Sequence, residues 1–556
     1  MEETIDFSDI HVAYLSMEIG IDPSVPTYSG GLGILAGDTL RSCADLGLPV
    51  VGITLLYEKG YFHQELDESG NQLESDTLWQ PKERLQQLPQ TVRVKIQDRD
   101  VVIGCWMYTL EGATGHVNRI LFLDTDREEN APEDRSITHH LYGGDQRYRL
   151  MQEIILGIGG VRMLQALACP IKKYHMNEGH AALLTVELHR QLGSIDAVRE
   201  HCVFTTHTPV PAGHDQFDGN MARDLLAENF PHEIVEEIFF EGKLNMTNLG
   251  LRFSDYVNGV AKKHGEVSRD MFPGYHIESI TNGVHSAFWT CPSMKELFDK
   301  HVKNWESDPF SLRYMLGVPR NQIWDAHMKA KEALISFVNE RYGTSMHKDV
   351  FTIGFARRAA TYKRGDMLFS DLQRLIHISN DVGKIQIIYG GKAHPHDGQG
   401  KDIIRHITQK MKELGKTIEC CYVQDYSIEE AKMMVAGVDL WLNTPLRPKE
   451  ASGTSGMKAA HNGVPQFSIL DGWWIEGHIE NKTGWSIGDH PHDLPENNHE
   501  HDVEDMYTKL EYIIVPMYYQ HRDEWIEIMR NCIAINGSFF NTHRMVQQYV
   551  LSAYFD

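Results

Sequence analysis

The segment VFTIGF (350–355), with the stretch ARRAATYKRGD (356–366) directly after it, decides the fold class. VFTIGF is a short run of mainly apolar residues, which is typical of a buried strand. The next stretch is basic and reads as a loop, and DMLFSDLQRLIHI (366–378) has the apolar spacing of an amphipathic helix. A second apolar run, KIQIIYGG (384–391), follows. This order of elements predicts a βαβ unit with parallel strands.

The same alternation extends in both directions along the chain. Towards the C-terminus we expect strands at 417–423, 438–444 and 464–470, and helices at 401–415, 427–437 and 454–463. Towards the N-terminus, strand-like runs occur at 11–18 and 48–57, and strand-then-turn units at 173–191 and 202–210. Short apolar strands that alternate with helices predict parallel sheets covered by helices on both faces.

The length of 556 residues exceeds what one hydrophobic core supports, so two domains are expected. We predict an α/β fold with two Rossmann-like, doubly wound domains that face a central cleft. The N-terminal domain would span 1–285 and the C-terminal domain 346–530, with a helical connection at 286–345. A C-terminal helix at 531–556 could pack back on the N-terminal domain. Because sites in such sheets lie beyond the carboxyl ends of the strands, the cleft is the expected active site.

Composition excludes several classes of protein. The net charge of −24 argues against nucleic-acid and anionic-membrane binding, because both need an excess of Lys and Arg. The acidic start MEETIDFSD has no signal-peptide pattern, and no apolar run is long enough to span a membrane. Eight scattered cysteines without CxxC pairs indicate free thiols in a reducing compartment. These features predict a cytoplasmic protein of the size of an enzyme.

Three motifs could bind anions. Ser29–Gly33 (SGGLG) precedes a predicted helix, where glycines let backbone N–H groups approach an anion; a tight turn is an equal alternative. Four basic residues lie between Arg357 and Arg364, after a predicted strand, and suit a phosphate unless they form a solvated surface patch.

The third motif is EASGTSGMK (450–458), in which small residues open a predicted helix. Lys458 alone would be read as an ordinary helical lysine. Beside an anion site it becomes a candidate Schiff-base residue for pyridoxal phosphate. Three anion sites at strand–helix junctions together predict a phosphorylated cofactor and a phosphate substrate or product.

At these motifs the sequence resembles the glycogen and maltodextrin phosphorylases, and most closely a compact prokaryotic branch. The resemblance rests on EASGT followed by MK at 450–458, on FARRAATYKR (355–364), and on motifs in the family's order upstream. The upstream motifs are YLSME (14–18), GGLG (30–33), NEGH (177–180), TTHTP (205–209), NGVAKKHGE (258–266) and ITNGV (280–284). The match covers about residues 11 to 475.

The resemblance implies a GT-B-type glycosyltransferase architecture and the phosphorolysis of α-1,4-glucan to α-glucose 1-phosphate with retention. Lys458 would carry pyridoxal 5′-phosphate. The remaining implied cofactor-binding residues are Thr454, Ser455, Arg357 and Tyr426. Inorganic phosphate would be held by Arg358, Lys363 and the backbone N–H groups of Gly31 and Leu32. The implied glucose-binding residues are Asn282, Glu450, Ser452 and Gly453, with His207 near the sugar.

The implied mechanism uses the cofactor's phosphate as a proton relay to the substrate phosphate. A phosphate group has a second pKa of roughly 6, which suits acid–base work near neutral pH. The implied partners are glucan and inorganic phosphate. No metal ion, nucleic acid or membrane is expected, and the chain could form a homo-oligomer. The chain begins close to the first shared strand, so we expect no phosphorylation or nucleotide control.

Two departures from the family pattern put details of the sugar subsite in question. Asn248 stands where mammalian and plant enzymes have a histidine, and Gly456 stands where the family has an asparagine before the MK pair. Alternative functions are a nucleotide-sugar-dependent glucan glycosyltransferase, a phosphorylase of a related α-glucoside, and a catalytically silent glucan-binding homologue. The MK lysine favours a phosphorylase, since the nucleotide-sugar enzymes do not need it.

Two further segments have open interpretations. HPHDLPENNHEHD (490–502) is rich in His and acidic residues, but its irregular spacing favours a solvated loop over a metal site. Trp473 and Trp474 could equally stack on a sugar or belong to the core.

Overall fold

The structure is a computed structural model that describes residues 6–415, 417–490 and 498–555. Residue contacts divide it into two compact units. Unit 1 comprises Met1–Phe62, Asp76–Thr281 and Met545–Asp556, and unit 2 comprises His63–Ser75 and Asn282–Arg544. The expected helical connection, 286–345, and residues 531–544 are both counted with unit 2. The domain limits drawn from the sequence stay a prediction.

Unit 1 contains a nine-stranded sheet in the order β14-β13-β9-β8-β1-β2-β7-β6-β5. Its strands are β1 (Val12–Ser16), β2 (Val50–Leu55), β5 (Gln86–Ile96), β6 (Arg99–Glu111), β7 (Val117–Asp124), β8 (Lys173–Asn177), β9 (Cys202–Thr205), β13 (Tyr256–Gly259) and β14 (Glu278–Ser279). The strands from β14 to β7 pair in parallel, and β6 and β5 add an antiparallel edge. β1 pairs with β2 on one side and with β8 on the other, so the strands added later along the chain lie on opposite sides of β1. This is a topological switch point.

Unit 2 contains a six-stranded sheet in the order β17-β16-β15-β18-β19-β20, and all of its strand pairs are parallel. Its strands are β15 (Phe351–Ala356), β16 (Ile385–Gly390), β17 (Glu419–Val423), β18 (Leu440–Asn443), β19 (Gln466–Ile469) and β20 (Gly484–Ile487). In chain order this is the doubly wound arrangement 3-2-1-4-5-6, with its switch point between β15 and β18. The prediction of mixed α/β structure with parallel sheets is therefore confirmed.

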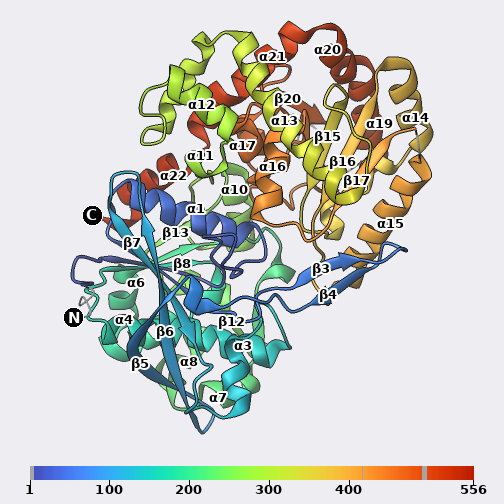
Figure 1. Ribbon diagram of the computed structural model, residues 1–556. Helices are drawn as coiled ribbons and strands as arrows, with labels where there is room; N and C mark the ends of the chain where they lie inside the picture. Colours follow the sequence, from blue (N-terminus) through green and yellow to red (C-terminus); the bar gives the residue numbers. More distant parts are fainter. Residues whose placement is uncertain (1–5, 416, 491–497, 556) are drawn as a thin grey trace. The chain divides into compact units, whose positions relative to one another are not determined.

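Helices cover both faces of the unit 2 sheet (Figure 1). The main helices of unit 2 are α12 (Pro292–His301), α13 (Arg320–Tyr342), α14 (Leu372–His377), α15 (Gly398–Leu414), α16 (Ile428–Gly437), α17 (Ser455–His461), α19 (His499–Lys509) and α21 (Arg522–Asn531). Those of unit 1 are α1 (Gly31–Asp45), α3 (Gln146–Ile154), α4 (Gly160–Ala166), α5 (Leu184–Leu192), α6 (Ile195–His201), α7 (Gly219–Leu226), α9 (Met246–Arg252), α10 (Lys262–Met271) and α22 (Thr542–Tyr549).

The amphipathic helix expected at 366–378 is not continuous. A 3-10 turn at Met367–Phe369 is followed by a separate helix, α14. The Asp371 side chain accepts a hydrogen bond from the N–H of Arg374 and so starts the new helix. An aspartate at this position favours a helix cap over a helix interior, and this local preference overrides the apolar spacing.

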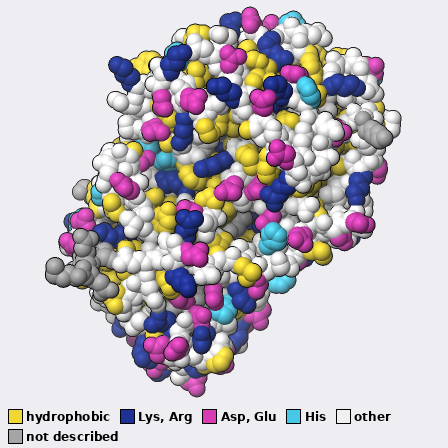
Figure 2. Space-filling view, in the orientation of Figure 1, with side chains coloured by type: hydrophobic (Ala, Val, Ile, Leu, Met, Phe, Trp, Pro, Cys, Tyr) yellow, Lys and Arg dark blue, Asp and Glu magenta, His cyan; other side chains and the backbone are white. Residues whose placement is uncertain are grey.

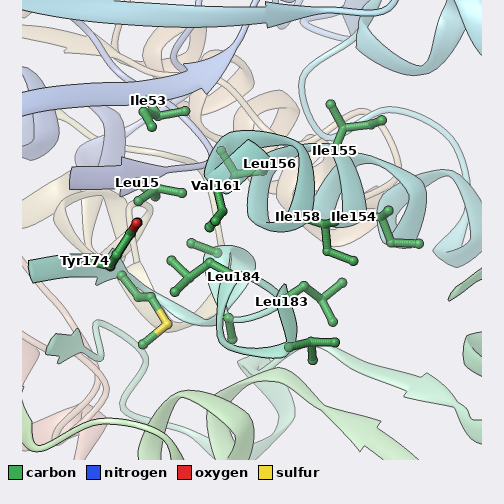
Figure 3. Close-up of a cluster of buried hydrophobic side chains, with 14 of the residues drawn as sticks. Leu15, Ile53, Ile154, Ile155, Leu156, Ile158, Val161, Tyr174, Leu183 and Leu184 are labelled. Carbon is green, nitrogen blue, oxygen red and sulfur yellow. The ribbon is translucent and has the colours of Figure 1, made fainter. Parts of the chain in front are cut away.

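The core of unit 1 lies between its sheet and the helical run that contains α3 and α4. Leu15 of β1 and Ile53 of β2 lie against Gly160, the first residue of α4. Leu156 and Val161 of the same helical run belong to this almost fully buried cluster (Figure 3). Burial of a side chain of this size is generally worth about 1.5–3 kcal/mol. This packing holds β1 in place, and the chain runs from β1 to the glycine motif at Ser29–Gly33.

The β3 (His63–Leu66) and β4 (Gln72–Ser75) hairpin belongs to unit 2 although it comes early in the chain, and it lies beside α15 (Figure 1). The Gln64 amide donates to the Gly391 carbonyl at 3.0 Å, and the Gln72 amide donates to the Ala393 carbonyl at 2.9 Å. The hairpin thereby holds the loop after β16.

A buried ion network fastens α13 to the unit 2 sheet. The Lys331 ammonium lies 2.5 Å from Asp439 Oδ2, and His327 Nε2 lies 2.9 Å from Asp439 Oδ1. Burial alone would raise the pKa of Asp439, but Lys331 and His327 outweigh it, and the pKa is lowered. Asp439 also accepts the N–H of Thr352 in β15.

Replacing Asp439 by alanine should destabilise unit 2 by about 3–5 kcal/mol, because it leaves a buried ammonium without its counter-charge. Asp523→Ala, which removes an exposed partner of Arg320, should cost less than about 1 kcal/mol. Urea unfolding of both variants tests this. Equal losses of stability would mean that the buried network contributes no more than a surface pair.

On the face drawn in Figure 2, Lys and Arg side chains are interspersed with Asp and Glu rather than gathered in one basic area. No helix in the described part of the chain combines the length and the apolar character needed to cross a bilayer. All eight cysteines are free thiols, as the sequence predicts.

Candidate active site

The cationic motif and the EASGTSGMK motif meet at the switch point of the unit 2 sheet. Arg357 follows β15 directly, and the segment that carries Glu450 leaves β18, the neighbouring strand. Because these two strands are parallel and adjacent, their carboxyl ends lie at the same edge of the sheet. This is the place where open α/β sheets bind their ligands. The sequence identified both motifs but not their adjacency.

Glu450 forms an ion pair with two of the predicted phosphate-binding cations. Its Oε2 atom lies 2.5 Å from Lys363 Nζ and 2.7 Å from an Arg357 guanidinium nitrogen. All three side chains are about nine-tenths buried. Burial alone would raise the pKa of Glu450, but Arg357 and Lys363 lower it to about 2. Glu450 is therefore an anion at neutral pH.

A cavity of about 10 Å³ adjoins this ion pair. Arg357, Arg358 and Lys363 line its polar side, and its apolar side includes Phe355 and Tyr389. The Lys363 ammonium also lies 4.5 Å from the centre of the Tyr362 ring. Burial would raise the pKa of Tyr362, yet the three cations together lower it. This edge of the sheet is therefore electropositive despite the overall negative charge of the chain.

Residues 471–473 clamp the segment that carries Glu450. The Glu450 N–H donates to Asp471 Oδ2 at 2.9 Å, and the Trp473 N–H donates to the Ser452 carbonyl at 2.9 Å. Gly472 has φ +56°, and a Cβ atom there would lie 2.3 Å from the Ser452 carbonyl oxygen. Asp471 was not among the residues predicted from the sequence. Its signal was an aspartate between an apolar strand and a glycine.

Asp471 should make stability depend on pH near neutrality. Burial raises its pKa to about 7. Because this value is above that of an unfolded aspartate, the stabilising contribution is complete below about pH 4 and is lost as the pH rises through 7. Between pH 5 and pH 8 the wild type should lose roughly 2 kcal/mol through this group. Urea unfolding at both pH values should show a smaller loss in Asp471→Asn; an identical loss would contradict the assignment.

Lys458 is buried on the second turn of α17, with 8% of its surface exposed. Its ammonium lies 3.8 Å from the centre of the Trp289 ring. A short helix and a buried aromatic ring thus hold the amine away from bulk solvent. The predicted neighbours Thr454 and Ser455 open the same helix, and the Ser455 hydroxyl accepts a hydrogen bond from Trp441 Nε1 at 3.0 Å.

Gly456, one of the departures from the family pattern, has a structural explanation. A Cβ atom at this position would lie 1.3 Å from Gln466 Oε1, so the side chain of Gln466 already fills the space. Gln466 is buried, and its Oε1 atom has no hydrogen-bond partner among the described residues. An amide side chain thus lies beside the MK pair, although it comes from β19.

Two of the predicted sugar-binding residues carry buried polar atoms without a partner. Asn282 and Ser452 have 4% and 3% of their surfaces exposed, and Asn282 Oδ1 and Ser452 Oγ accept or donate no hydrogen bond within the described parts of the chain. Such atoms are costly unless a ligand or water satisfies them. Gly453 has φ +74° and lies against the Glu450 side chain.

Tyr426 lies beside the end of β16. A Cβ atom added at Gly390 would be 3.0 Å from the Tyr426 ring. The glycine is therefore needed for the close approach of this ring to the sheet.

In unit 1, Gly31 and Leu32 are the first two residues of α1, so their N–H groups have no acceptor within the helix. The Glu18 carboxylate holds the preceding turn by accepting the N–H groups of Ser29 and Gly30 at 2.5 and 3.1 Å. Glu18 lies in the motif YLSME but was not predicted to have a role of its own. The glycine motif is thus a helix start that a buried carboxylate positions.

His207 lies at the other side of the unit 1 switch point. Its Nε2 atom is 2.6 Å from Asn177 Oδ1, and its N–H donates to Glu178 Oε2 at 2.8 Å. Burial and neighbouring histidines lower the pKa of His207 to about 3, so the ring is neutral. Glu178, in the motif NEGH, also accepts the Thr208 hydroxyl at 2.9 Å. This anchoring role of Glu178 was not predicted from the sequence.

The structure decides between the two interpretations for the tryptophan pair but not for the histidine-rich segment. Trp473 and Trp474 are 2% and 1% exposed, and Trp473 packs on Phe540, so both belong to the core. Most of the histidine-rich segment 490–502 lies outside the described residues, and α19 begins at His499.

Comparisons with known proteins agree with one another. A family model described as carbohydrate phosphorylase matches residues 20–104 and 232–511. Maltodextrin phosphorylase of Thermococcus litoralis is 40% identical over 97% of this chain and 70% of its own length. Glycogen phosphorylase of Aquifex aeolicus is 35% identical over 98% of this chain and 86% of its own length. An uncharacterised protein of Methanocaldococcus jannaschii is 32% identical over 98% of this chain and 99% of its own length.

Proposed function

This chain belongs to the carbohydrate phosphorylase family, and from that premise we propose that it cleaves α-1,4-glucan with inorganic phosphate to release α-glucose 1-phosphate. The observation that carries the proposal is the cationic site formed by Arg357, Arg358 and Lys363 at the switch point of unit 2. A binding module for neutral glucan would not need three cations about a buried edge of its sheet.

The cofactor in this proposal is pyridoxal 5′-phosphate, with Lys458 as the residue that carries it. The residues fit this group, because an amine held against Trp289 and away from solvent can react with an aldehyde. Thr454, Ser455 and Arg357 would bind the cofactor's phosphate, and Tyr426 would pack near it. Bound pyridoxal phosphate supplies a phosphate group that exchanges a proton with the substrate phosphate.

Arg358 and Lys363 would bind the substrate phosphate, and the N–H groups of Gly31 and Leu32 would assist them. Their charges keep two phosphate groups together and stabilise the charge that moves between them in the transition state. The substrate phosphate protonates the departing glycosidic oxygen and attacks the anomeric carbon from the same face, which retains the configuration.

Glu450, Asn282 and the backbone around Ser452 and Gly453 would orient the terminal glucose. The unpartnered Asn282 Oδ1 and Ser452 Oγ atoms support this role, since sugar hydroxyls could satisfy them. His207, as a neutral ring, would contact the sugar as a hydrogen-bonding group and not as a charge.

The GT-B-type arrangement, in which the two units face a common cleft, is part of this proposal, as are a cytoplasmic location and glucan and phosphate as partners. A homo-oligomer is compatible with it.

The experiment is phosphorolysis of a panel of α-glucans and disaccharides by the purified holoenzyme, with glucose 1-phosphate measured. We expect release from α-1,4-glucans that depends on inorganic phosphate, and no transfer of glucose to the glucan when a nucleotide sugar replaces phosphate. Release only from a disaccharide would assign a related α-glucoside instead. No product from any member of the panel would refute the proposal.

A further inference from the structure

Glu450 occupies the position of an anionic ligand. Its carboxylate accepts from both Lys363 and Arg357, and it is ionised because these cations lower its pKa. The same two cations are predicted to bind phosphate groups. The carboxylate and a phosphate are both anions, so they repel each other beside the Lys363 ammonium, and Glu450 at 2.5 Å from that ammonium opposes the binding of phosphate there.

When the cofactor is bound, Glu450 and inorganic phosphate compete for only one of the two cations. In the proposed function Arg357 also binds the cofactor's phosphate, whereas Lys363 binds inorganic phosphate. Lys363 is therefore the donor for which Glu450 and inorganic phosphate compete in the holoenzyme. In the proposed function Glu450 binds the sugar, so its ion pair with Lys363 has to break before it can do so.

The backbone of Glu450 is fixed, so the side chain alone can make the exchange. Asp471 holds the Glu450 N–H, and the Trp473 N–H holds the Ser452 carbonyl two residues later. The Glu450 side chain lies against Gly453, with its carboxyl carbon 3.4 Å from the position of an added Cβ atom. Because the backbone on both sides of Glu450 is held, a rotation of its side chain is the movement that the exchange requires.

We infer that inorganic phosphate displaces the Glu450 carboxylate from Lys363 and thereby releases it to bind hydroxyl groups of the sugar, so that phosphate and sugar bind with positive coupling. This inference rests on the proposed function and adds a regulation of the same site. Each ligand makes the other bind more tightly, and by linkage the two enhancements are equal. In the absence of sugar, phosphate binds weakly, because it must displace the Glu450 carboxylate from Lys363.

The test is calorimetric titration of the holoenzyme with inorganic phosphate, with and without 1,5-anhydro-D-glucitol. This sugar analogue has no glycosidic bond, so no turnover occurs. In the wild type, the analogue should lower the Kd for phosphate several-fold, and phosphate should lower the Kd for the analogue by the same factor. In Glu450→Gln, phosphate without the analogue should bind roughly tenfold more tightly than to the wild type, and the coupling factor should fall to about one.

Two further variants complete the design. Glu450→Asp keeps the charge on a shorter side chain and should show intermediate phosphate affinity and coupling. Glu504→Gln removes the same charge from an exposed pair with Arg374 and should match the wild type in both quantities. A simple loss of negative charge near the site would tighten phosphate binding but would leave the coupling factor unchanged.

A coupling factor of one or less in the wild type would overturn the inference, as would phosphate binding by Glu450→Gln that is no tighter than in the wild type. Release of glucose 1-phosphate by the wild type is measured separately. Active enzyme without coupling refutes this inference alone, whereas absence of product refutes the proposed function.

Discussion

Lys458→Ala is expected to abolish glucose 1-phosphate release, with a fall of roughly 10³-fold or more, and to remove the absorbance of bound pyridoxal phosphate. The substitution deletes the only amine proposed to carry the cofactor, and proton transfer by a positioned acid generally accelerates a reaction by roughly 10²–10⁴-fold. The amine is buried beside Trp289, so alanine leaves a cavity and not an exposed surface. Absorbance and activity of the purified variant check the two effects together.

Lys432→Ala is the matched control for this prediction. Lys432 also lies over an aromatic ring, with its ammonium 3.6 Å from the centre of the Phe288 ring. Loss of that contact should leave both the cofactor absorbance and the activity near wild-type values. Lys458→Arg keeps the positive charge but offers no amine that can react with an aldehyde, so it should resemble Lys458→Ala. Normal cofactor absorbance in either Lys458 variant would refute the role of this lysine.

Lys363→Met is expected to lower kcat/KM by roughly 10²–10³-fold, the usual effect of deleting one group that stabilises transition-state charge. The loss should appear in the KM for phosphate as well as in kcat, because the ammonium is proposed to bind phosphate in both states. The variant also leaves Glu450 with Arg357 as its remaining ion-pair partner among those described. Initial rates at varied phosphate and glucan separate these effects.

Lys392→Met provides the comparison, since Lys392 also forms a close ion pair in unit 2, at 2.5 Å from Asp425. It should retain nearly full activity. If Lys363→Met changed only the KM for glucan, or if both variants lost activity equally, Lys363 would not be the phosphate-binding residue.

Much of the fold could be predicted from local patterns. The strands expected at 350–355, 384–391 and 464–470 correspond to β15, β16 and β19, and GGLG begins α1. The strand order could not be predicted in the same way, because it depends on pairing between segments far apart in sequence. β18 pairs with β15 although more than eighty residues separate them, and this pairing creates the switch point.

Many residues of the site could be predicted from the sequence, but the contacts between them could not. Arg357, Lys363 and Glu450 were each predicted to bind a ligand, but three different ones. That these side chains form an ion pair with one another is seen only in the structure. Asp471 was missed because its role is to hold the backbone N–H of Glu450, and an aspartate between an apolar strand and a glycine does not identify that partner. The glycine at position 456 could not be explained from the sequence, because the Gln466 side chain that fills the space comes from β19.

The decisive measurement for the phosphate site is the location of inorganic phosphate in a crystal of the holoenzyme. We expect phosphate density at the carboxyl end of β15, in contact with Arg358 and Lys363 and beside the cofactor on Lys458. Density for phosphate at another place, with Lys363 still bound to Glu450 at saturating phosphate, would contradict this expectation.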